Sequence, residues 1–107
     1  MEESQKVVVL ITTDSPESAR SLAEQLVTNG KAACVNIVPK VDSVFQWEGN
    51  TESEQETLLF VKSKLSALPA LVDLVRQLHK YDVPEIIALP IIGGYDAYLD
   101  WVDSEVD

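Results

Sequence analysis

The chain has 107 residues, of which 46% are hydrophobic and 24% are charged, values that are typical of a globular domain rather than of a disordered segment. Its 18 acidic residues outnumber its 8 basic residues, and the resulting net charge of -10 repels phosphate backbones and anionic lipid, so neither nucleic-acid nor membrane binding is expected. The single cysteine excludes an intrachain disulfide and no apolar run reaches membrane-spanning length, which together predict a cytoplasmic protein.

The first two predicted elements are a strand and a helix. Residues 6–12 form a continuous apolar run rich in β-branched side chains, which is typical of a central strand. Residues 14–30 predict a helix. Ser15 is its expected cap, Pro16 suits the first helical position, and Gly30 is expected to end it. Hydrophobic residues at helical spacing give this helix one apolar face: Ala19, Leu22, Ala23, Leu26 and Val27.

A long hairpin is predicted next. Residues 31–49 are rich in β-formers and predict one extended strand. Pro39 interrupts this strand, because proline lacks the N–H that a ladder needs and is tolerated at an edge, a bulge or a bend. Residues 48–54 predict a polar turn, and residues 55–64 predict the returning strand.

The remaining predicted elements are a helix, a short strand and a last helix, at residues 66–79, 84–91 and 95–106. Ser66 is the expected cap of the first of these helices, and the apolar face of that helix is predicted to be Leu68, Leu71, Val72, Val75 and Leu78. The order βαββαβ with an added C-terminal helix is typical of a ferredoxin-like α+β sandwich, here predicted as a single domain over residues 1–107.

The predicted hairpin is longer than the body that should carry it. Residues 32–48 would span roughly 50 Å at about 3.3 Å per residue, whereas a domain of this size has a diameter of about 35 Å. The overhang would expose unpaired strand edges together with Phe45 and Trp47. A neighbouring copy of the same chain is the simplest way to cover them, so we expect an oligomer in which Phe45 and Trp47 are interface anchors.

Five stretches of the chain, in the same order and at the same spacing, resemble the CutA family of divalent-cation tolerance proteins: AACVNIVP (32–39), SVFQWEG (43–49), ETLLFVKSK (56–64), HKYDVPEIIALPI (79–91) and YLDW (98–101). The resemblance implies a ferredoxin-like fold, a tight homotrimer and a role linked to copper and other divalent metals. It also implies a relation in architecture, though not in function, to the trimeric PII signalling proteins.

The chain departs from the family at positions that bear on metal binding. The frequent His-Pro-Tyr-Glu run of the family is His-Lys-Tyr-Asp at residues 79–82 here. Family members linked to copper can carry a cysteine near the end of the first strand and a second histidine beside the first. Those places hold Ile11 and Leu78, which are not metal ligands. The resemblance therefore implies weak rather than tight metal binding.

His79, the only histidine, has two interpretations. It lies at the predicted end of a helix, where the helix dipole favours an imidazolium, so it can be a simple cap. Alternatively, it is the centre of a metal site with Asp82 and Glu85, beside Tyr81, and copper(II) is the divalent ion expected to bind best. One histidine cannot form a tetrahedral structural zinc site within one chain.

Several other residues are candidates for a cleft or for simple packing. Lys62 either protects a strand edge or balances a carboxylate in a cleft that also contains Tyr81 and Trp101. Trp101 can equally close over a neighbour's strand or over its own core. Cys34 is expected to pack in the core, since the sequence shows no electropositive surroundings for a thiolate. The acidic residues near the predicted turn are expected to be a solvated loop that collects cations weakly at most: Glu48, Glu52, Glu54 and Glu56.

These observations predict a non-enzymatic, metal-responsive homotrimer of the CutA type that requires no cofactor and binds copper(II) or another divalent ion weakly. One alternative is a trimeric signalling module that binds a small effector. Another is an enzyme that uses His79 as an acid or base in a cleft between subunits. The sequence identifies no protein partner.

Overall fold

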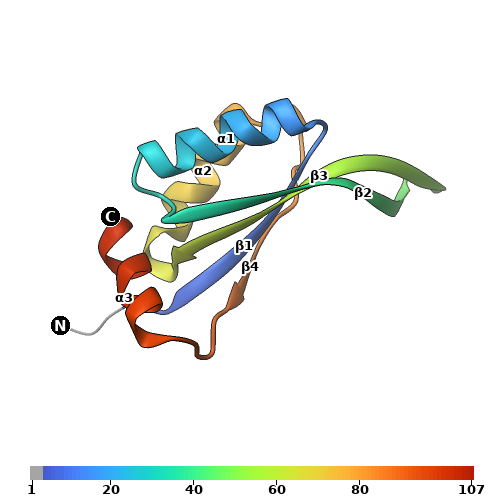
Figure 1. Cartoon of the computed structure of the whole chain (residues 1–107). Helices are drawn as coiled ribbons and strands as arrows, with labels where there is room; N and C mark the ends of the chain where they lie inside the picture. The colour runs from blue at the N-terminus through green and yellow to red at the C-terminus, as the bar shows by residue number, and fades with distance from the viewer. Residues whose placement is uncertain (1–3) are drawn as a thin grey trace.

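The computed structural model describes residues 4–107, which form a four-stranded sheet, three α-helices and one short 3-10 helix (Figure 1). In chain order these elements are β1 (Lys6–Thr13), α1 (Pro16–Thr28), β2 (Cys34–Trp47), β3 (Asn50–Lys64), η1 (Leu65–Ala67), α2 (Leu68–Leu78), β4 (Ile86–Pro90) and α3 (Asp96–Glu105). The predicted order βαββαβ plus a helix is confirmed. None of the helices in this part of the chain is long and apolar enough to cross a membrane.

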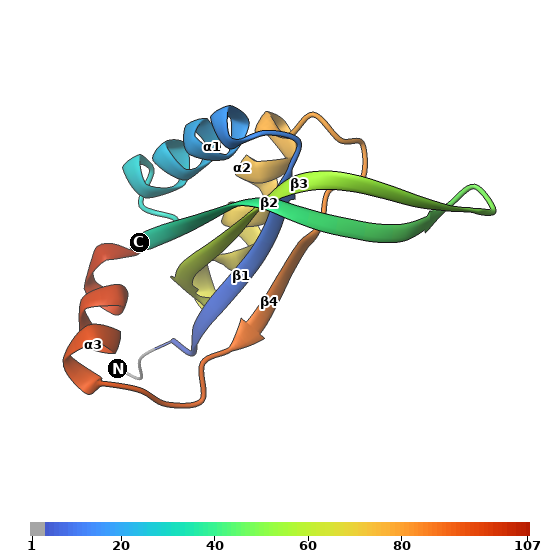
Figure 2. The ribbon, with the colours of Figure 1, turned by 45° about the vertical axis from the view of Figure 1, so that its right-hand side comes forward.

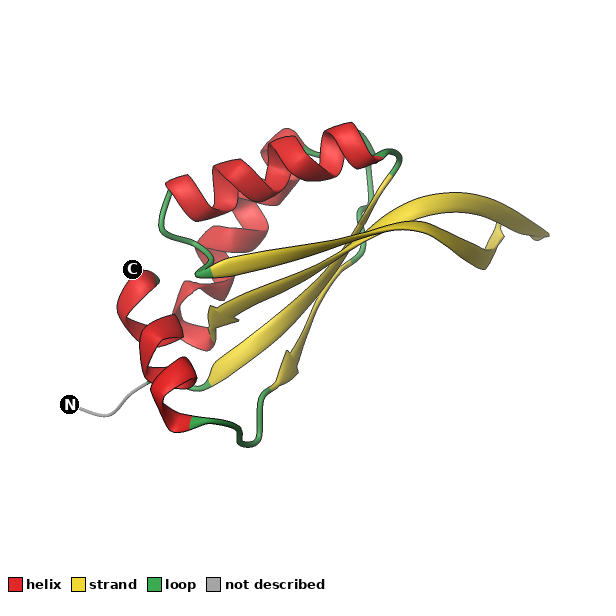
Figure 3. Ribbon diagram, viewed as in Figure 1, coloured by secondary structure: helices red, strands yellow, loops and turns green. Residues whose placement is uncertain are grey.

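The sheet has the order β2-β3-β1-β4, and every neighbouring pair is antiparallel. β1 and β3 are central, so the two βαβ units interleave as in ferredoxin-like folds. Figure 3 shows α1 and α2 together on one face of the sheet, with α3 at the end of the sheet opposite the hairpin tip.

The core lies between the sheet and the layer formed by α1 and α2. Alternate residues of the two central strands point into it, as the period of two predicts. The buried residues of this cluster include Val7, Val9, Ile11, Leu59 and Val61 from the strands and Ala19, Leu22, Ala23, Leu26, Leu71 and Val75 from the helices. Two predicted core residues, Val27 and Leu78, are instead about half exposed, because each lies at the margin of its apolar stripe.

The starts of the two long helices differ in how well the sequence predicted them. The Ser18 N–H donates to Ser15 Oγ at 3.1 Å, which confirms the predicted cap of α1. The predicted cap at Ser66 is wrong. The chain first makes the 3-10 turn η1, so α2 begins two residues later, with Ala67 in the cap position and no side-chain cap.

The hairpin turn is shorter than the sequence predicted. Only Glu48 and Gly49 form it, and both have positive φ angles, 48° and 82°, as a two-residue type I′ turn requires. Asn50 already pairs with Trp47, so residues 50–54 are strand rather than turn. The prediction of a polar turn over residues 48–54 is therefore wrong in length, and its glutamates from Glu52 onward belong to β3.

The hairpin extends well beyond the sheet, as predicted. β1 reaches β3 only as far as the pair Thr13–Thr57, whereas β2 and β3 remain paired to their tip. We call residues 41–56 the ribbon (Figure 2). It extends the molecule to 48 Å along one axis, against 25 and 22 Å along the others. At its base two residues, Pro39 and Lys40, stand opposite Thr57, which confirms a bulge at Pro39 on an edge strand.

The second face of the sheet, opposite α1 and α2, is only partly covered. The strand register places apolar residues there, among them Val38, Ile87 and Leu89, each between 38% and 50% exposed. α3 packs against the end of this face, where Lys6 and Lys64 form ion pairs with Asp103 at 3.5 and 3.7 Å. Over the rest of this face, within residues 4–107, apolar side chains such as Ile87 and Leu89 remain about half exposed beside polar ones such as Lys62.

Candidate functional site

His79 ends α2, and both of its ring nitrogens make hydrogen bonds within the fold. Its Nε2 lies 2.7 Å from the carbonyl oxygen of Thr12 in β1, and its Nδ1 lies 3.0 Å from the backbone nitrogen of Tyr81. A carbonyl accepts and a backbone N–H donates, so Nε2 carries the proton and Nδ1 supplies the lone pair. The imidazole therefore ties the end of β1 to the segment after α2. A metal ion would have to displace one of these hydrogen bonds.

Tyr81 connects the same segment to the base of the ribbon. Its hydroxyl donates to Glu56 Oε2 at 2.9 Å, and the ring stacks at a tilt on His79 with 4.7 Å between the centroids. Glu56 is only 8% exposed. Burial raises the pKa of Tyr81 well above its usual value, and the hydrogen bond and negative charge of Glu56 act in the same direction. Tyr81 is therefore a neutral hydrogen-bond donor and not a phenolate ligand.

The raised pKa of Tyr81 predicts a loss of stability in alkali. Above about pH 10 the unfolded chain releases the phenolic proton while the folded chain retains it, so the free energy of unfolding falls as pH rises from the unfolded toward the folded pKa. We expect urea midpoints measured between pH 8 and pH 11 to fall less steeply in Tyr81→Phe than in the wild type. Parallel curves for the two proteins would contradict this prediction.

A cleft of about 740 Å³ lies between the ribbon and the segment that follows His79. Phe45 and Trp47 of β2 line it, together with the carboxylates of β3. Tyr81 and two further carboxylates lie on the opposite side. Among residues 4–107, five acidic residues line the cleft, and no lysine or arginine does: Glu52, Glu54, Glu56, Asp82 and Glu85. Such a cavity favours cations.

The predicted metal residues do not converge within one chain. Asp82 and Glu85 line the cleft, but His79 does not, because its ring is turned toward β1. Within residues 4–107 no group of three or more His, Cys, Asp or Glu side chains is arranged to hold a metal ion. A metal site made of His79, Asp82 and Glu85 stays a prediction, and it would need rearrangement or a second chain.

Of the predicted cleft residues, only Tyr81 lines this cleft. Lys62 lies opposite Cys34 in the register, six residues from Glu56, or roughly 20 Å along the strand. Trp101 is on α3, where it contacts Tyr98 at 5.5 Å between ring centroids. Cys34 is half-buried rather than in the core. A cleft that joins Lys62 and Trp101 to Tyr81 would have to be shared between subunits.

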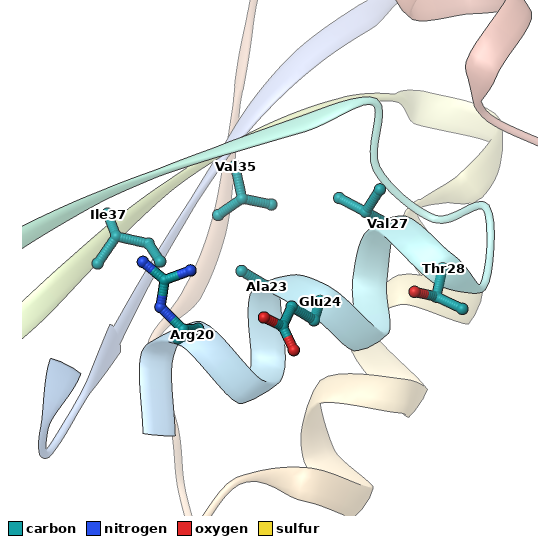
Figure 4. A pocket seen from close by; sticks show the side chains of 7 residues that line it. All are labelled: Arg20, Ala23, Glu24, Val27, Thr28, Val35 and Ile37. Carbon is teal, nitrogen blue, oxygen red and sulfur yellow. The ribbon is translucent and has the colours of Figure 1, made fainter. Parts of the chain in front are cut away.

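A second, smaller hollow of about 310 Å³ lies between α1 and the edge strand β2 (Figure 4). Ala23, Val27, Val35 and Ile37 make it largely apolar, and the charged side chains of Arg20 and Glu24 also line it. The described residues give this hollow one carboxylate and no other candidate metal ligand, so the acidic cleft is the stronger candidate site. Sequence reasoning missed that cleft. Its signal was the alternation of glutamate along residues 52–56, which fits one face of a strand better than a turn.

The sequence and the fold of this chain are similar to those of known proteins. Residues 7–105 match the family model described as CutA1 divalent ion tolerance protein. The chain is 52% identical over 95 residues to the divalent-cation tolerance protein CutA of Thermus thermophilus, covering 89% of this chain and 92% of that protein. It is 48% identical over 108 residues to the chloroplastic protein CutA of Arabidopsis thaliana, covering 97% of this chain but 59% of that protein. The fold matches the solved structure of a divalent cation tolerance protein from Thermus thermophilus with a TM-score of 0.94. The two sequences are 48% identical, and the match covers 95% of this chain and 99% of that one.

Proposed function

This chain belongs to the CutA1 family of divalent ion tolerance proteins, and from that premise we propose that it is a metal-responsive, non-enzymatic homotrimer that binds divalent cations weakly at its subunit boundaries. The observation that carries the proposal is the acidic cleft, where the described part of the chain supplies five carboxylates and no basic residue to the lining. Carboxylates attract divalent cations, but a site with fewer than three converging donors in one chain holds them weakly.

The homotrimer is supported by two surfaces of the chain. On the ribbon, Trp47 is 56% exposed and Phe45 is 36% exposed. On the second face of the sheet, Ile87 and Leu89 are also exposed. A closed ring of identical chains covers such surfaces and leaves no open edge. The number three comes from the family resemblance. We place the trimer in the cytoplasm because of the single cysteine, although the Arabidopsis relative is named chloroplastic.

Copper(II) is the divalent ion proposed to bind best, because most nitrogen and oxygen sites prefer it among first-row metals. The proposed ligands are His79, whose Nδ1 becomes free when its hydrogen bond to Tyr81 opens, together with Asp82 and Glu85. Ile11 is buried in the core and Leu78 supplies no donor atom, so neither position strengthens the site.

Copper titration tests this proposal. By calorimetry at about 0.15 M salt, where the Debye length is about 8 Å, we expect weak copper binding to the wild type. His79→Ala is expected to abolish it. The double variant Asp82→Asn and Glu85→Gln is also expected to weaken it, and this variant leaves both His79 hydrogen bonds in place. Circular dichroism of each variant checks the fold. Copper binding that is unchanged in both variants would show that the ion lies elsewhere.

The cleft also favours a second candidate, a trimeric module that binds a small effector. Its volume of about 740 Å³ lies within the range of about 300–1,000 Å³ found for small-molecule sites. An enzyme that uses His79 as acid or base has less support, since both ring nitrogens already have partners within the fold.

A further inference from the structure

One face of β3 carries opposite charges at its two ends. β3 runs from the body of the sheet into the ribbon (Figure 2), and residues two apart along a strand share a face. The residues at odd positions from Thr57 to Ser63 are buried against the helix layer. The opposite face is acidic on the ribbon, apolar in the middle and cationic in the body of the sheet, with the residues Glu52, Glu54, Glu56, Leu58, Phe60 and Lys62.

Lys62 finds no carboxylate to pair with in the described part of its own chain. It is half-buried, and its neighbours in the register are Val8 of β1 and Cys34 of β2. No ion pair joins Lys62 to a carboxylate within residues 4–107. Glu54 on the same face lies about 27 Å away at about 3.4 Å per residue. An ammonium group among apolar side chains is stabilised by a carboxylate, and a neighbouring chain can bring one to Lys62.

The ribbon carries the carboxylates that this lysine lacks. Glu52 and Glu54 are exposed, and among the described residues no ion pair joins either of them to a lysine or arginine. Glu52 lies opposite Phe45 in the register, and Trp47 is two residues further along β2, so both rings share a face with the two glutamates. The ribbon therefore presents exposed carboxylates beside exposed aromatic rings.

The second face of the sheet presents the complementary groups. Ile87 and Leu89 of β4 are about half exposed there, and Lys62 lies on the same face two strands away. Interfaces combine apolar contact at the centre with matched charges that fix the register of the two partners. A ribbon laid across this face would meet apolar side chains with its aromatic rings and a cation with its carboxylates.

We propose that the ribbon of one protomer lies across the second face of its neighbour, and that Lys62 of the neighbour pairs with Glu52 and Glu54. The acidic cleft is then incomplete until the neighbouring copy supplies this lysine. Its ammonium group occupies the carboxylates of the ribbon and leaves Asp82 and Glu85, on the other side of the cleft, for a divalent cation. A ribbon that meets a sheet face is a head-to-tail contact, which closes into a ring. This inference rests on the proposed homotrimer and names the residue that each neighbour adds to the cleft.

Charge reversal in the full chain tests the pair, with the assembly measured by light scattering over a dilution series. Lys62→Glu is expected to raise the concentration at which the assembly dissociates by at least about tenfold, because like charges then meet. Adding Glu54→Lys is expected to recover at least about threefold of that loss. The matched control adds Glu24→Lys instead, which gives the same net charge but places the new lysine on the exposed side of α1. This control is expected to recover nothing.

Two further measurements locate the contact. Arg76→Glu makes the same change of charge as Lys62→Glu on an exposed position of α2, and it is expected to leave the assembly intact. Carbodiimide joins an ammonium group directly to a carboxylate that it touches. We expect it to link Lys62 of one wild-type chain to Glu52 or Glu54 of another, as mapped by mass spectrometry, and to form no such link in Lys62→Met. A dominant link from Lys62 to a different carboxylate would overturn the pairing.

The outcomes separate this contact from the homotrimer itself. A wild-type chain that is monomeric at micromolar concentration would overturn both. A wild-type trimer that tolerates Lys62→Glu but dissociates in Leu89→Glu would keep the homotrimer and show that another segment of the neighbour covers the second face. If Glu54→Lys restores Lys62→Glu no better than Glu24→Lys does, the lysine acts through net charge and the proposed pair does not exist. Copper titration of His79→Ala tests the metal role independently of all these results.

Discussion

Replacing Phe45 and Trp47 together by aspartate is expected to convert the proposed homotrimer into monomers. Both side chains lie on the ribbon, beyond the last pair between β1 and β3 at Thr13–Thr57, and they are 36% and 56% exposed. Buried aromatic anchors of an interface contribute roughly 2–4 kcal/mol each, and an aspartate in their place would leave a buried charge. Light scattering over a dilution series should give about three times the chain mass of 11.8 kDa for the wild type and one chain mass for the variant.

Two further variants define where the interface lies. Leu89→Glu, on the second face of the sheet, is expected to weaken the trimer as well. Val27→Glu changes an equally exposed apolar residue on the helix layer and is expected to leave it intact. A wild-type monomer at micromolar concentration would contradict the assembly. A trimer that survives the aspartate pair at Phe45 and Trp47 would show that the ribbon is not the anchor.

Leu71→Ala is expected to lower the free energy of unfolding by about 2–5 kcal/mol. Leu71 is fully buried on α2 within the cluster that joins both long helices to the sheet. Removing its branched end leaves a cavity that the two packed layers cannot easily close. Urea unfolding measures the loss. Both proteins must be compared at the same concentration, since unfolding of an oligomer depends on it.

Leu78→Ala is the matched control on the same helix. Leu78 is 48% exposed, so most of the transfer and cavity cost is absent, and we expect a change of about 1 kcal/mol or less. Equal losses for the two variants would mean that Leu78 is covered in the assembly. A small loss for Leu71→Ala would show that the core between α2 and the sheet is not where stability resides.

Much of the fold follows from local signals in the sequence. Ser15 and Pro16 start α1 because a cap oxygen and a preset φ satisfy the first helical turn before any tertiary contact forms. Pro39 marks the bulge because it lacks a ladder donor. The length of the β-forming run predicts the overhang. The polar composition of residues 50–54, however, predicted a turn where β3 begins. These residues form a strand because the Glu48–Gly49 turn sets their pairing with β2, and not because they are buried.

The candidate site was decided mainly by tertiary structure. His79, Asp82 and Glu85 are close in sequence, yet the imidazole turns to Thr12 of β1 while both carboxylates line the cleft. Nothing local specifies that partner, because Thr12 comes from a strand 67 positions away. Tertiary structure also decides the position of Lys62. The register between β2 and β3 places it opposite Cys34 and far from Tyr81. The five carboxylates of the cleft gather only because the returning ribbon and the segment after α2 meet above the end of β1, and their shared surroundings exist only in the folded chain.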